Sequence, residues 1–221
     1  MRKLTMGMAL VTVSVVLGGC VAAPPTIDGK LGDAAWATAH VIPLEKLEQG
    51  GKTDVKTVAH VKVDETHLYL AVECFDDAAT LKTLKADVTE HDGSNIWQDD
   101  EVELFLDPTN KRDSYYQIIV NYKGVTWDAY HPSPGSADNT WEPKYQVKTS
   151  VGAKSWVVEL ALPLSELVHT KKTASTWAIN ILRNRSASSE LIYSTPTMTS
   201  SSHTPSAFGK LEGMPVVEPK K

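Results

Sequence analysis

Cysteine is almost absent from this chain, since Cys20 and Cys74 are the only two among 221 residues. A framework of several disulfides, the usual stabilisation of small exported domains, is therefore excluded. The sequence also lacks a nucleophile elbow, a phosphate-binding loop and the spacing of a catalytic triad. Its seven histidines show none of the spacings typical of zinc ligands. These absences predict that the chain is not itself an enzyme.

Basic residues are outnumbered, and long apolar segments are missing. Lys and Arg total 22 against 27 Asp and Glu, which gives a formal net charge of −5. Such a mildly acidic chain is poorly suited to nucleic acid or to an anionic lipid surface, so neither is expected as a partner. No apolar run approaches the roughly 18 residues that a membrane-spanning helix needs.

The first twenty residues have the order of an export signal. Two basic residues precede an uncharged, mostly apolar stretch at 4–17, and Gly18-Gly19-Cys20 follows it. A charged head, a short apolar stretch and small residues before a cut are typical of a secretory signal peptide. The cysteine after two glycines resembles the lipobox of bacterial lipoproteins, in which that thiol is acylated after cleavage.

We therefore expect a lipoprotein signal peptide at 1–19, lipidation at Cys20 and a short tether at 20–25. The protein would be exported and anchored to the cell envelope, at the outer membrane or the periplasmic face of a membrane. Cleavage removes two basic residues and no acid, so the net charge changes from −5 to −7. The alternative is an ordinary signal peptide that happens to be followed by a cysteine.

Period-two patterns dominate residues 26–212. Short β-branched and aromatic runs are separated by Gly, Asn, Asp and Pro, which predicts an all-β fold, an antiparallel β-sandwich of immunoglobulin-like or jelly-roll-like type. Helix is expected only as single turns, and the tail 213–221 is expected to be disordered. Expected strands lie at 55–63, 67–75, 101–107, 115–122, 125–130, 145–151, 155–162, 176–183 and 207–211, and expected helical turns at 33–39, 78–85 and 163–168.

The acidic strand 101–107 has a distinctive phase. Val102, Leu104 and Leu106 share one face and are expected in the core, which leaves Glu101, Glu103 and Phe105 on the other face. A face that mixes acid and aromatic side chains favours a binding surface. Other side chains that the same reasoning places in the core are Cys74, as an inert thiol, and Trp36, Trp156 and Trp177.

Three segments are more specific than the composition. They are TIDGKLGDAAW at 26–36, NIWQDDEVELFLD at 95–107, and WVVELALPL at 156–164 followed by WAINILR at 177–183. In this order they resemble the carbohydrate-binding modules of family 9 and the related DOMON-type sandwiches. The resemblance covers nearly all of the chain beyond residue 25. It implies a β-sandwich that binds sugars.

The resemblance also implies binding residues. The family's sugar-clamping Trp matches Trp97, its hydroxyl-binding Glu matches Glu103, and a further polar position matches Asn121. An Arg of the family pattern is replaced by Ile119. No Trp follows Trp177, so the second clamp must come from elsewhere. The candidates for it are Trp127, Trp141 and Tyr193. Asn180 and Arg183 could reach the ligand or could pair internally with Glu103 or Asp128.

Cofactors are implied only weakly. Family 9 modules contain structural calcium, so calcium is a candidate, with Asp99-Asp100 or the acidic loop 107–113 as ligands because oxygen atoms in turns suit this cation. Haem is not expected, since no CxxCH is present. Some related sandwiches are nevertheless cytochromes, for which Met198, His203 or a Lys could supply axial ligands.

The leading hypothesis from these observations is a membrane-tethered, non-catalytic lipoprotein that binds sugars or polysaccharide ends through an aromatic platform. A glycan-degrading enzyme would be its natural partner, and any catalysis would belong to that enzyme. The alternatives are a haem-binding electron-transfer domain of DOMON type and a structural accessory domain in an envelope complex.

Overall fold

The computed structural model describes residues 23–48, 50–168, 171–195 and 201–219. The expected signal peptide and Cys20 lie outside these described residues. Within them the chain is all-β, with twelve strands, all paired antiparallel. The strands are β1 (His40–Leu47), β2 (Lys52–Val63), β3 (His67–Phe75), β4 (Glu101–Asp107), β5 (Tyr115–Asn121), β6 (Thr126–Ser133), β7 (Ser136–Asp138), β8 (Gln146–Val151), β9 (Ser155–Pro163), β10 (Thr176–Arg185), β11 (Glu190–Tyr193) and β12 (Gly209–Glu212).

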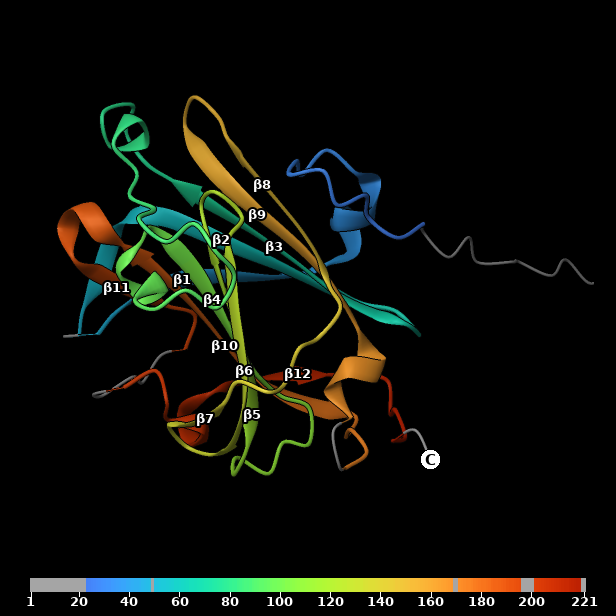
Figure 1. The fold of residues 1–221 in the computed structure, drawn as a ribbon. Coiled ribbons are helices and arrows are strands. Elements are labelled where there is room, and N and C mark those ends of the chain that lie inside the picture. The colour runs from blue at the N-terminus through green and yellow to red at the C-terminus, as the bar shows by residue number, and fades with distance from the viewer. Residues whose placement is uncertain (1–22, 49, 169–170, 196–200, 220–221) are drawn as a thin grey trace, which may run out of the picture.

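The strands follow the order β7-β6-β5-β4-β10-β11-β1-β2-β3-β9-β8, and β12 pairs with β10. Only two residue pairs, Lys46 with Tyr193 and Leu47 with Ile192, join β1 to β11. This narrow connection lets the sheet fold back on itself. Strands β4 to β7 and β10 to β12 then form one layer, and β1, β2, β3, β8 and β9 form the other (Figure 1). The predicted antiparallel β-sandwich is confirmed.

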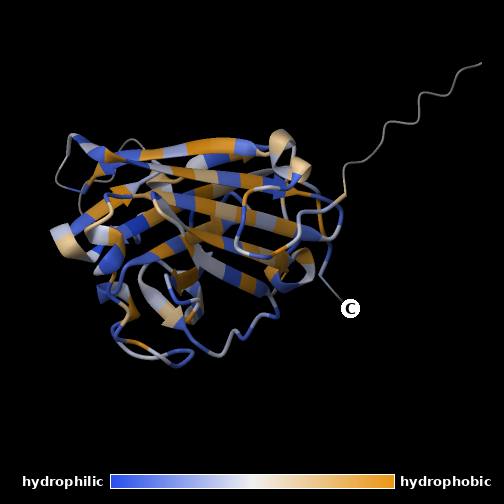
Figure 2. Cartoon of the chain, turned by 90° about the horizontal axis from the view of Figure 1, so that it is seen from above, coloured by the Kyte–Doolittle hydropathy of each residue, from blue (hydrophilic) through white to orange (hydrophobic). Residues whose placement is uncertain are grey.

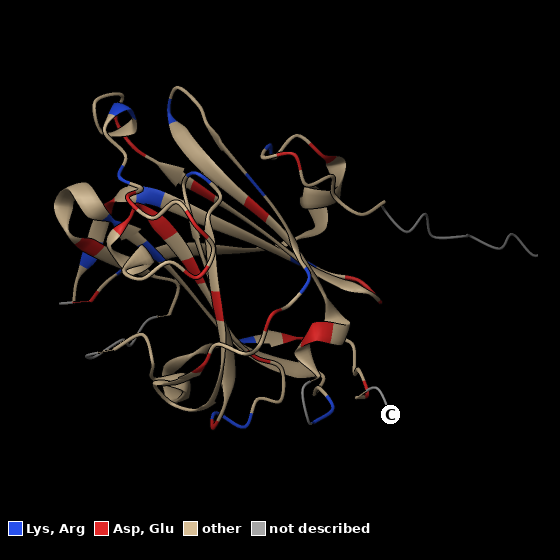
Figure 3. Cartoon of the chain, viewed as in Figure 1, with Lys and Arg blue, Asp and Glu red and all other residues tan. Residues whose placement is uncertain are grey.

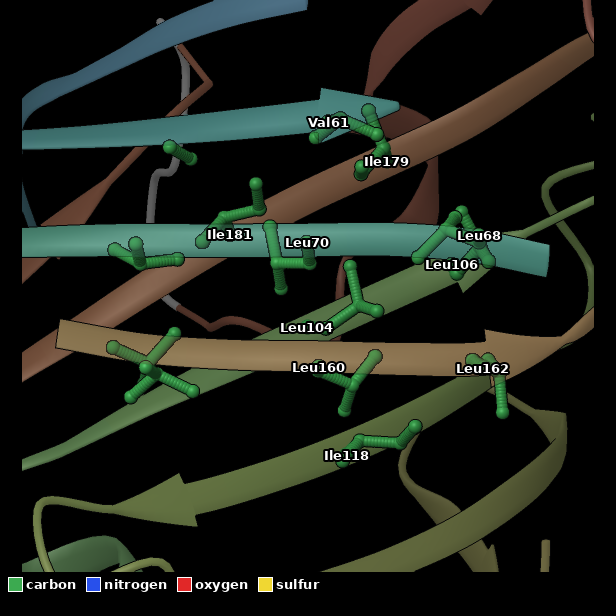
Figure 4. Close-up of a cluster of buried hydrophobic side chains, with 14 of the residues drawn as sticks. Val61, Leu68, Leu70, Leu104, Leu106, Ile118, Leu160, Leu162, Ile179 and Ile181 are labelled. Atoms are coloured by element: carbon green, nitrogen blue, oxygen red, sulfur yellow. The ribbon is translucent and has the colours of Figure 1, made fainter. Parts of the chain in front are cut away.

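The core lies between these two layers. Leu70 of β3 and Leu160 of β9 face Leu104 of β4 and Ile118 of β5 across the interior (Figure 4), and all four are at most 3% exposed. Burying such a side chain contributes about 1.5–3 kcal/mol each. The bands along the strands alternate between hydrophobic and hydrophilic (Figure 2), as strands with one face in the core require.

In the part of the chain that the structure describes, helix occurs only as short 3-10 turns, as expected. The turns are η1 (Ala34–Thr38), η2 (Thr80–Lys82), η3 (Ile96–Gln98), η4 (Leu164–Leu167), η5 (Ser186–Ser188) and η6 (Pro205–Ala207). No helix among the described residues is long and apolar enough to cross a membrane. Trp36, Trp156, Trp177 and Cys74 are buried, as the phase of their segments predicted. Burial raises the pKa of the Cys74 thiol to about 12, which makes it unreactive.

The N-terminal segment packs on the outer face of the layer that contains β3 and β9. Trp36 contacts Tyr69 and Ala161, whose side chains point away from the core. The Glu159 carboxylate on the same face accepts hydrogen bonds from the backbone N–H groups of residues 28–30, at 2.7–3.2 Å, and from Trp36 Nε1 at 3.0 Å. Gly29, at φ +84°, lies close to the Thr149 backbone, so a side chain there would collide.

The segment after β12 differs from expectation. Residues 213–219 are ordered against the body of the domain instead of forming a disordered tail. Met214 is 7% exposed, and its N–H donates to the Ser175 carbonyl. Val217 exchanges two hydrogen bonds with Thr173. Both Met214 and Val217 are apolar residues that contact the main core cluster.

Candidate binding site

A cavity of ≈ 460 Å³ lies on the outer face of the layer formed by β4, β5, β6, β10 and β11. Residues on this face alternate with the core residues of the same strands, as Glu103 alternates with Leu104. The lining combines aromatic, aliphatic and polar side chains. Its residues are Glu48, Trp97, Glu103, Gln117, Ile119, Trp127, His131, Gly135, Ala137, Leu182, Leu191, Tyr193, Ser201, Ser202 and His203.

Trp97 stands at the rim of this cavity. It belongs to η3, which begins after Asn95 in the left-handed region at φ 70°, a conformation that Asn tolerates better than most residues. Ile96 is fully buried and fixes the turn, while Trp97 keeps 49% of its surface exposed. Asn184 of β10 donates from Nδ2 to the Trp97 carbonyl at 2.7 Å. A tryptophan held by its backbone and exposed by its side chain is a preformed flat platform.

Two further aromatic side chains reach the same cavity. Trp127 of β6 is half-buried in the lining, and Tyr193 of β11 is nearly fully buried there. Tyr193 Oη donates to Glu48 Oε1 at 3.2 Å. Trp141, the third candidate for a second clamp, lies in the core against Tyr116 and donates from Nε1 to the Glu166 carbonyl. Trp127 and Tyr193 therefore remain as partners for Trp97.

A chain of hydrogen bonds crosses the floor of the cavity. Gln117 Nε2 donates to Glu103 Oε2 at 2.6 Å, and Gln117 Oε1 lies 2.8 Å from His131 Nε2. With the amide in this orientation, His131 must carry its proton on Nε2. Desolvation by burial lowers the pKa of His131 to about 4, so the ring is neutral at physiological pH. The Glu103 carboxyl is thereby fixed in position with an oxygen left for a ligand.

The two acids of β4 on this face lie side by side. Burial raises the pKa of Glu103 to about 7, while hydrogen bonds from Gln117 and Glu101 lower it. The pKa of Glu101 is raised well above its ordinary value by complete burial and by the charge of Glu103. Glu101 is therefore a neutral acid that supports Glu103. Its carboxyl oxygens have no other hydrogen-bond partner among the described residues.

A cluster of rings closes one end of the cavity. Tyr115 stacks on His131 with centroids 4.5 Å apart, and Phe105 meets His203 edge-on at 5.7 Å. Gly135 N–H donates to Tyr115 Oη, which also lies within hydrogen-bond distance of His203 Nδ1, at 2.7 Å. Burial lowers the pKa of His203 as well. Of the side chains considered for haem ligation, His203 lines the cavity, whereas Met198 lies outside the described residues.

Three of the expected binding residues do not line the cavity. Asn121 is fully buried and builds the turn between β5 and β6. Its Oδ1 accepts from the N–H groups of Lys123 and Val125, and its Nδ2 donates to Val88 and Asp99. Because all of its polar groups are used, the expected ligand contact is replaced by a structural role.

Asn180 and Arg183 of β10 are also separated from the cavity. Asn180 accepts from the hydroxyls of Ser194 and Thr195, and it is fully buried. Arg183 points to the core side, where it is paired with Asp76 and donates to Thr57 Oγ1 at 3.0 Å. Of the two possibilities that the sequence left open for Arg183, internal pairing is the one observed, with Asp76 as partner.

The candidate calcium ligands do not fit a cation. Asp99 and Asp100 accept backbone N–H groups of the segment 85–88, and Asp100 also accepts from Ser186 N–H. Both oxygens of Asp107 accept hydrogen bonds within its own turn, from Thr109 and Arg112. These carboxylates already accept hydrogen bonds that hold their own loops, and calcium at these positions stays a prediction.

Several lining residues escaped sequence reasoning, among them Gln117, His131, Leu182 and Leu191. Gln117 could have been predicted, because it lies on the same face of its strand as Ile119, which matches a site position of the family pattern. The others depend on which strands become neighbours. Leu191 belongs to β11, a strand that the sequence did not predict.

The fold and this cavity define a β-sandwich binding module whose aromatic-lined pocket lies on the outer face of one layer. The chain belongs to the carbohydrate family 9 binding domain-like family, whose family model matches residues 27–213. Domains of this family are binding modules. Acidic residues recur within the strands, while Lys and Arg are scattered over loops and strands (Figure 3).

Similar proteins agree with this assignment. Endo-1,4-beta-xylanase A of Thermotoga maritima is 28% identical over 164 residues, which are 71% of this chain and 14% of that enzyme. The Thermotoga neapolitana enzyme of the same name is 33% identical over 105 residues, 44% of this chain and 9% of the enzyme. The chain thus spans only a small part of these enzymes. A family 9 carbohydrate-binding module from Caldicellulosiruptor kristjanssonii, solved with cellotriose, shares the fold with a TM-score of 0.63 at 19% identity, and the match covers 90% of this chain and 92% of that one.

Proposed function

We propose that this protein is a non-catalytic receptor that binds a sugar or the end of a polysaccharide in the cavity beside Trp97. The observation that carries the proposal is the convergence of Trp97, Trp127 and Tyr193 on a fixed carboxyl, Glu103. Flat aromatic rings stack on the apolar C–H face of a pyranose. A carboxyl group with free acceptor capacity binds adjacent sugar hydroxyls.

The size and lining of the cavity support a small ligand. Its volume of ≈ 460 Å³ lies within the range of about 300–1,000 Å³ that is typical of small-molecule sites. Ile119 occupies the position at which the family pattern has an Arg, so one charged contact is replaced by an apolar one. This exchange favours a ligand held mainly by stacking, with modest affinity and broad tolerance of sugar type.

We further propose that lipid on Cys20 anchors the domain to the cell envelope. The order of charge, apolar stretch and Gly18-Gly19-Cys20 in the sequence supports this. The similarity to segments of xylanases supports a role beside glycan-degrading enzymes, which would release the fragments that the domain captures. Catalysis would then belong to such a partner enzyme.

Calorimetric titration with cello- and xylo-oligosaccharides, chosen after a glycan array, tests the proposal. We expect Trp97→Ala to weaken binding at least 10-fold, because the exposed ring supplies stacking area and little fold stability. Trp127→Ala is expected to weaken it similarly. Val41→Ala is the matched control, since Val41 is 61% exposed on a strand of the other layer. Unchanged affinity of both Trp variants would refute the assigned pocket. A Soret band after haem-replete expression would instead favour the haem hypothesis.

A further inference from the structure

A second hollow adjoins the sugar cavity and shares part of its wall. It is a groove of ≈ 350 Å³ between η3 and the turn that joins β10 to β11. Trp97 and Leu191 belong to the lining of both hollows. Because they share these side chains, the groove and the cavity are neighbours at the rim where Trp97 stands. The remaining residues of the groove lining are all polar and are Lys85, Gln98, Asn184, Ser186 and Ser189.

The strand register places the groove in line with the cavity. On β10, Leu182 lines the cavity, and Asn184, the next residue on the same face, lines the groove. Their partners on β4 are Glu103 and Glu101. Phe105, whose ring belongs to the cluster that closes one end of the cavity, lies on β4 in the opposite direction. A sugar chain whose last unit lies toward the ring cluster can therefore continue along β10 into the groove.

Both sides of the groove are held by one buried carboxylate. Asp100 is 1% exposed, and it accepts the Lys85 N–H at 2.7 Å through Oδ2 and the Ser186 N–H at 3.1 Å through Oδ1. Ser186 Oγ also donates to the Gln98 carbonyl at 3.1 Å. These contacts fix η3 and the β10–β11 turn relative to each other. A groove that is formed before the ligand arrives requires little ordering when the ligand binds.

The groove presents polar groups that the fold leaves available. Asn184 Nδ2 donates to a backbone carbonyl, but its Oδ1 accepts no hydrogen bond among the described residues. Gln98 and Ser189 are exposed, and within the described part of the chain their side chains make no hydrogen bond. Lys85 Nζ lies 3.4 Å from the exposed carboxylate of Asp87. Amide, hydroxyl and ammonium groups are suitable partners for the hydroxyls of a sugar.

We infer that the ligand of this protein is a neutral oligosaccharide chain, with its terminal unit in the cavity and its following units in the groove. This inference rests on the proposed function, since it requires a sugar beside Trp97. Lys85 is balanced by Asp87 and Asp100, so the groove favours no acidic sugar. A monosaccharide would occupy the cavity alone and gain none of the contacts that the groove offers.

Calorimetric titration with cello- and xylo-oligosaccharides of increasing length tests the inference. We expect the affinity to rise by about 10-fold or more from the disaccharide to the tetrasaccharide. The reason is that each further hydrogen bond strengthens binding by roughly 2- to 10-fold. The shortest sugar that binds measures the cavity, and the gain with length measures the groove.

A double variant, Lys85→Ala with Gln98→Ala, assigns this gain to the groove. We expect the gain to fall to about 2-fold, because the hydrogen bonds of both side chains are removed. The affinity for the shortest sugar should stay unchanged, since neither residue lines the cavity. The matched control is Lys148→Ala with Gln146→Ala, because both residues are exposed on β8 of the other layer. Gln98→Ala alone alters an exposed side chain and tests the groove even if the double variant folds poorly.

The possible outcomes separate this inference from the proposed function. Equal affinity for every length would overturn the inference and leave the proposed function standing, because the sugar would then bind in the cavity alone. A gain with length that the groove variants retain would also overturn it, since the outer units would lie elsewhere on the molecule. Absence of binding at every length would remove the proposed function and this inference together.

Discussion

At the scale of single residues, the carboxyl of Glu103 is the most unusual group of the pocket. It is buried next to a second acid, Glu101. Its hydrogen-bond donor is the Gln117 amide, and no cationic side chain pairs with it among the described residues. Such a group is costly to ionise in the folded protein. The fold tolerates this cost at the position where a ligand is expected, a pattern that functional sites share.

We predict that Glu103 makes the free energy of unfolding depend on pH. Its pKa rises from 4.5 to about 7 on folding, so between these values the folded state holds a proton that the unfolded chain releases. The stabilisation is fully present below pH 4.5 and is lost as the pH rises to 7, by on the order of 3 kcal/mol. Glu103→Gln lacks this titration.

Urea unfolding of both proteins at pH 5 and pH 8 provides the measurement. The variant is expected to gain stability relative to the unaltered protein as the pH rises. Equal pH dependence of the two would mean that Glu103 ionises freely in the fold. The comparison cancels the acids that do not interact with Glu103. The charge of Glu103 raises the pKa of Glu101, so the difference between the two proteins reports the titration of this pair.

Residue patterns predicted the rim of the pocket better than its interior. The resemblance to family 9 modules placed Trp97 and Glu103 at one site, strand phase placed Glu103 on the outer face, and the cavity lies there. Asn121 shares that phase, but the turn after β5 consumes its amide. The alternation along a strand predicts which face of the sheet a side chain lies on, but it does not predict which residues the side chain contacts. The partner of Arg183 was not predicted for the same reason, since Asp76 is 107 residues away in the sequence.

At the scale of elements, one side chain makes several of the polar contacts that hold the N-terminal turn. Glu159 of β9 accepts three backbone N–H groups and the indole N–H of Trp36. The turn itself has little secondary structure, with only the five residues of η1 in a 3-10 helix. The Glu159 carboxylate therefore satisfies backbone N–H groups that a neighbouring strand would satisfy in a sheet.

We predict that Glu159→Gln destabilises the domain by about 2 kcal/mol, because the amide nitrogen would face donors that now bind the second oxygen. Urea unfolding followed by tryptophan fluorescence measures it, and Trp36 reports directly on this turn. Glu45→Gln is the control, since Glu45 is exposed and paired only with Lys52, and it should change stability by less than about 0.5 kcal/mol. An effect no larger than the control's would show that the turn is held by apolar packing alone.

Strand prediction succeeded where one strand face is in the core and failed at the seam between the layers. Strands β2 to β6, β8, β9, β10 and β12 overlap the expected ranges. Strand β1 was missed because Pro43 interrupts it and Val41 is exposed, so period two is broken. Strands β7 and β11 are short, with three and four residues. Strand β7 pairs with the end of β6, and β11 pairs with β10 and, through two residue pairs, with the distant β1.

At the scale of the whole molecule, the anchor and the pocket can be separated experimentally. We predict that Cys20→Ser moves the protein from the membrane fraction to the soluble fraction of the cells that produce it. Sugar affinity should remain unchanged, since the described domain begins three residues later and is complete without lipid. Fractionation with and without detergent measures the membrane association, and calorimetric titration of the purified protein measures the sugar affinity. Identical fractionation of the two proteins would contradict lipidation at this cysteine.

The two outer faces of the sandwich differ, since the N-terminal segment covers one and the cavity opens on the other. Residues 26–36 cover the outer face of β3 and β9 through Trp36 and Glu159, and the cavity beside Trp97 opens on the outer face of the other layer. A chain tethered through Cys20 would then rest with its β3–β9 side toward the lipid and its cavity toward the surrounding medium. A sugar fragment could enter or leave from above without the domain turning over, even where neighbouring proteins crowd it sideways.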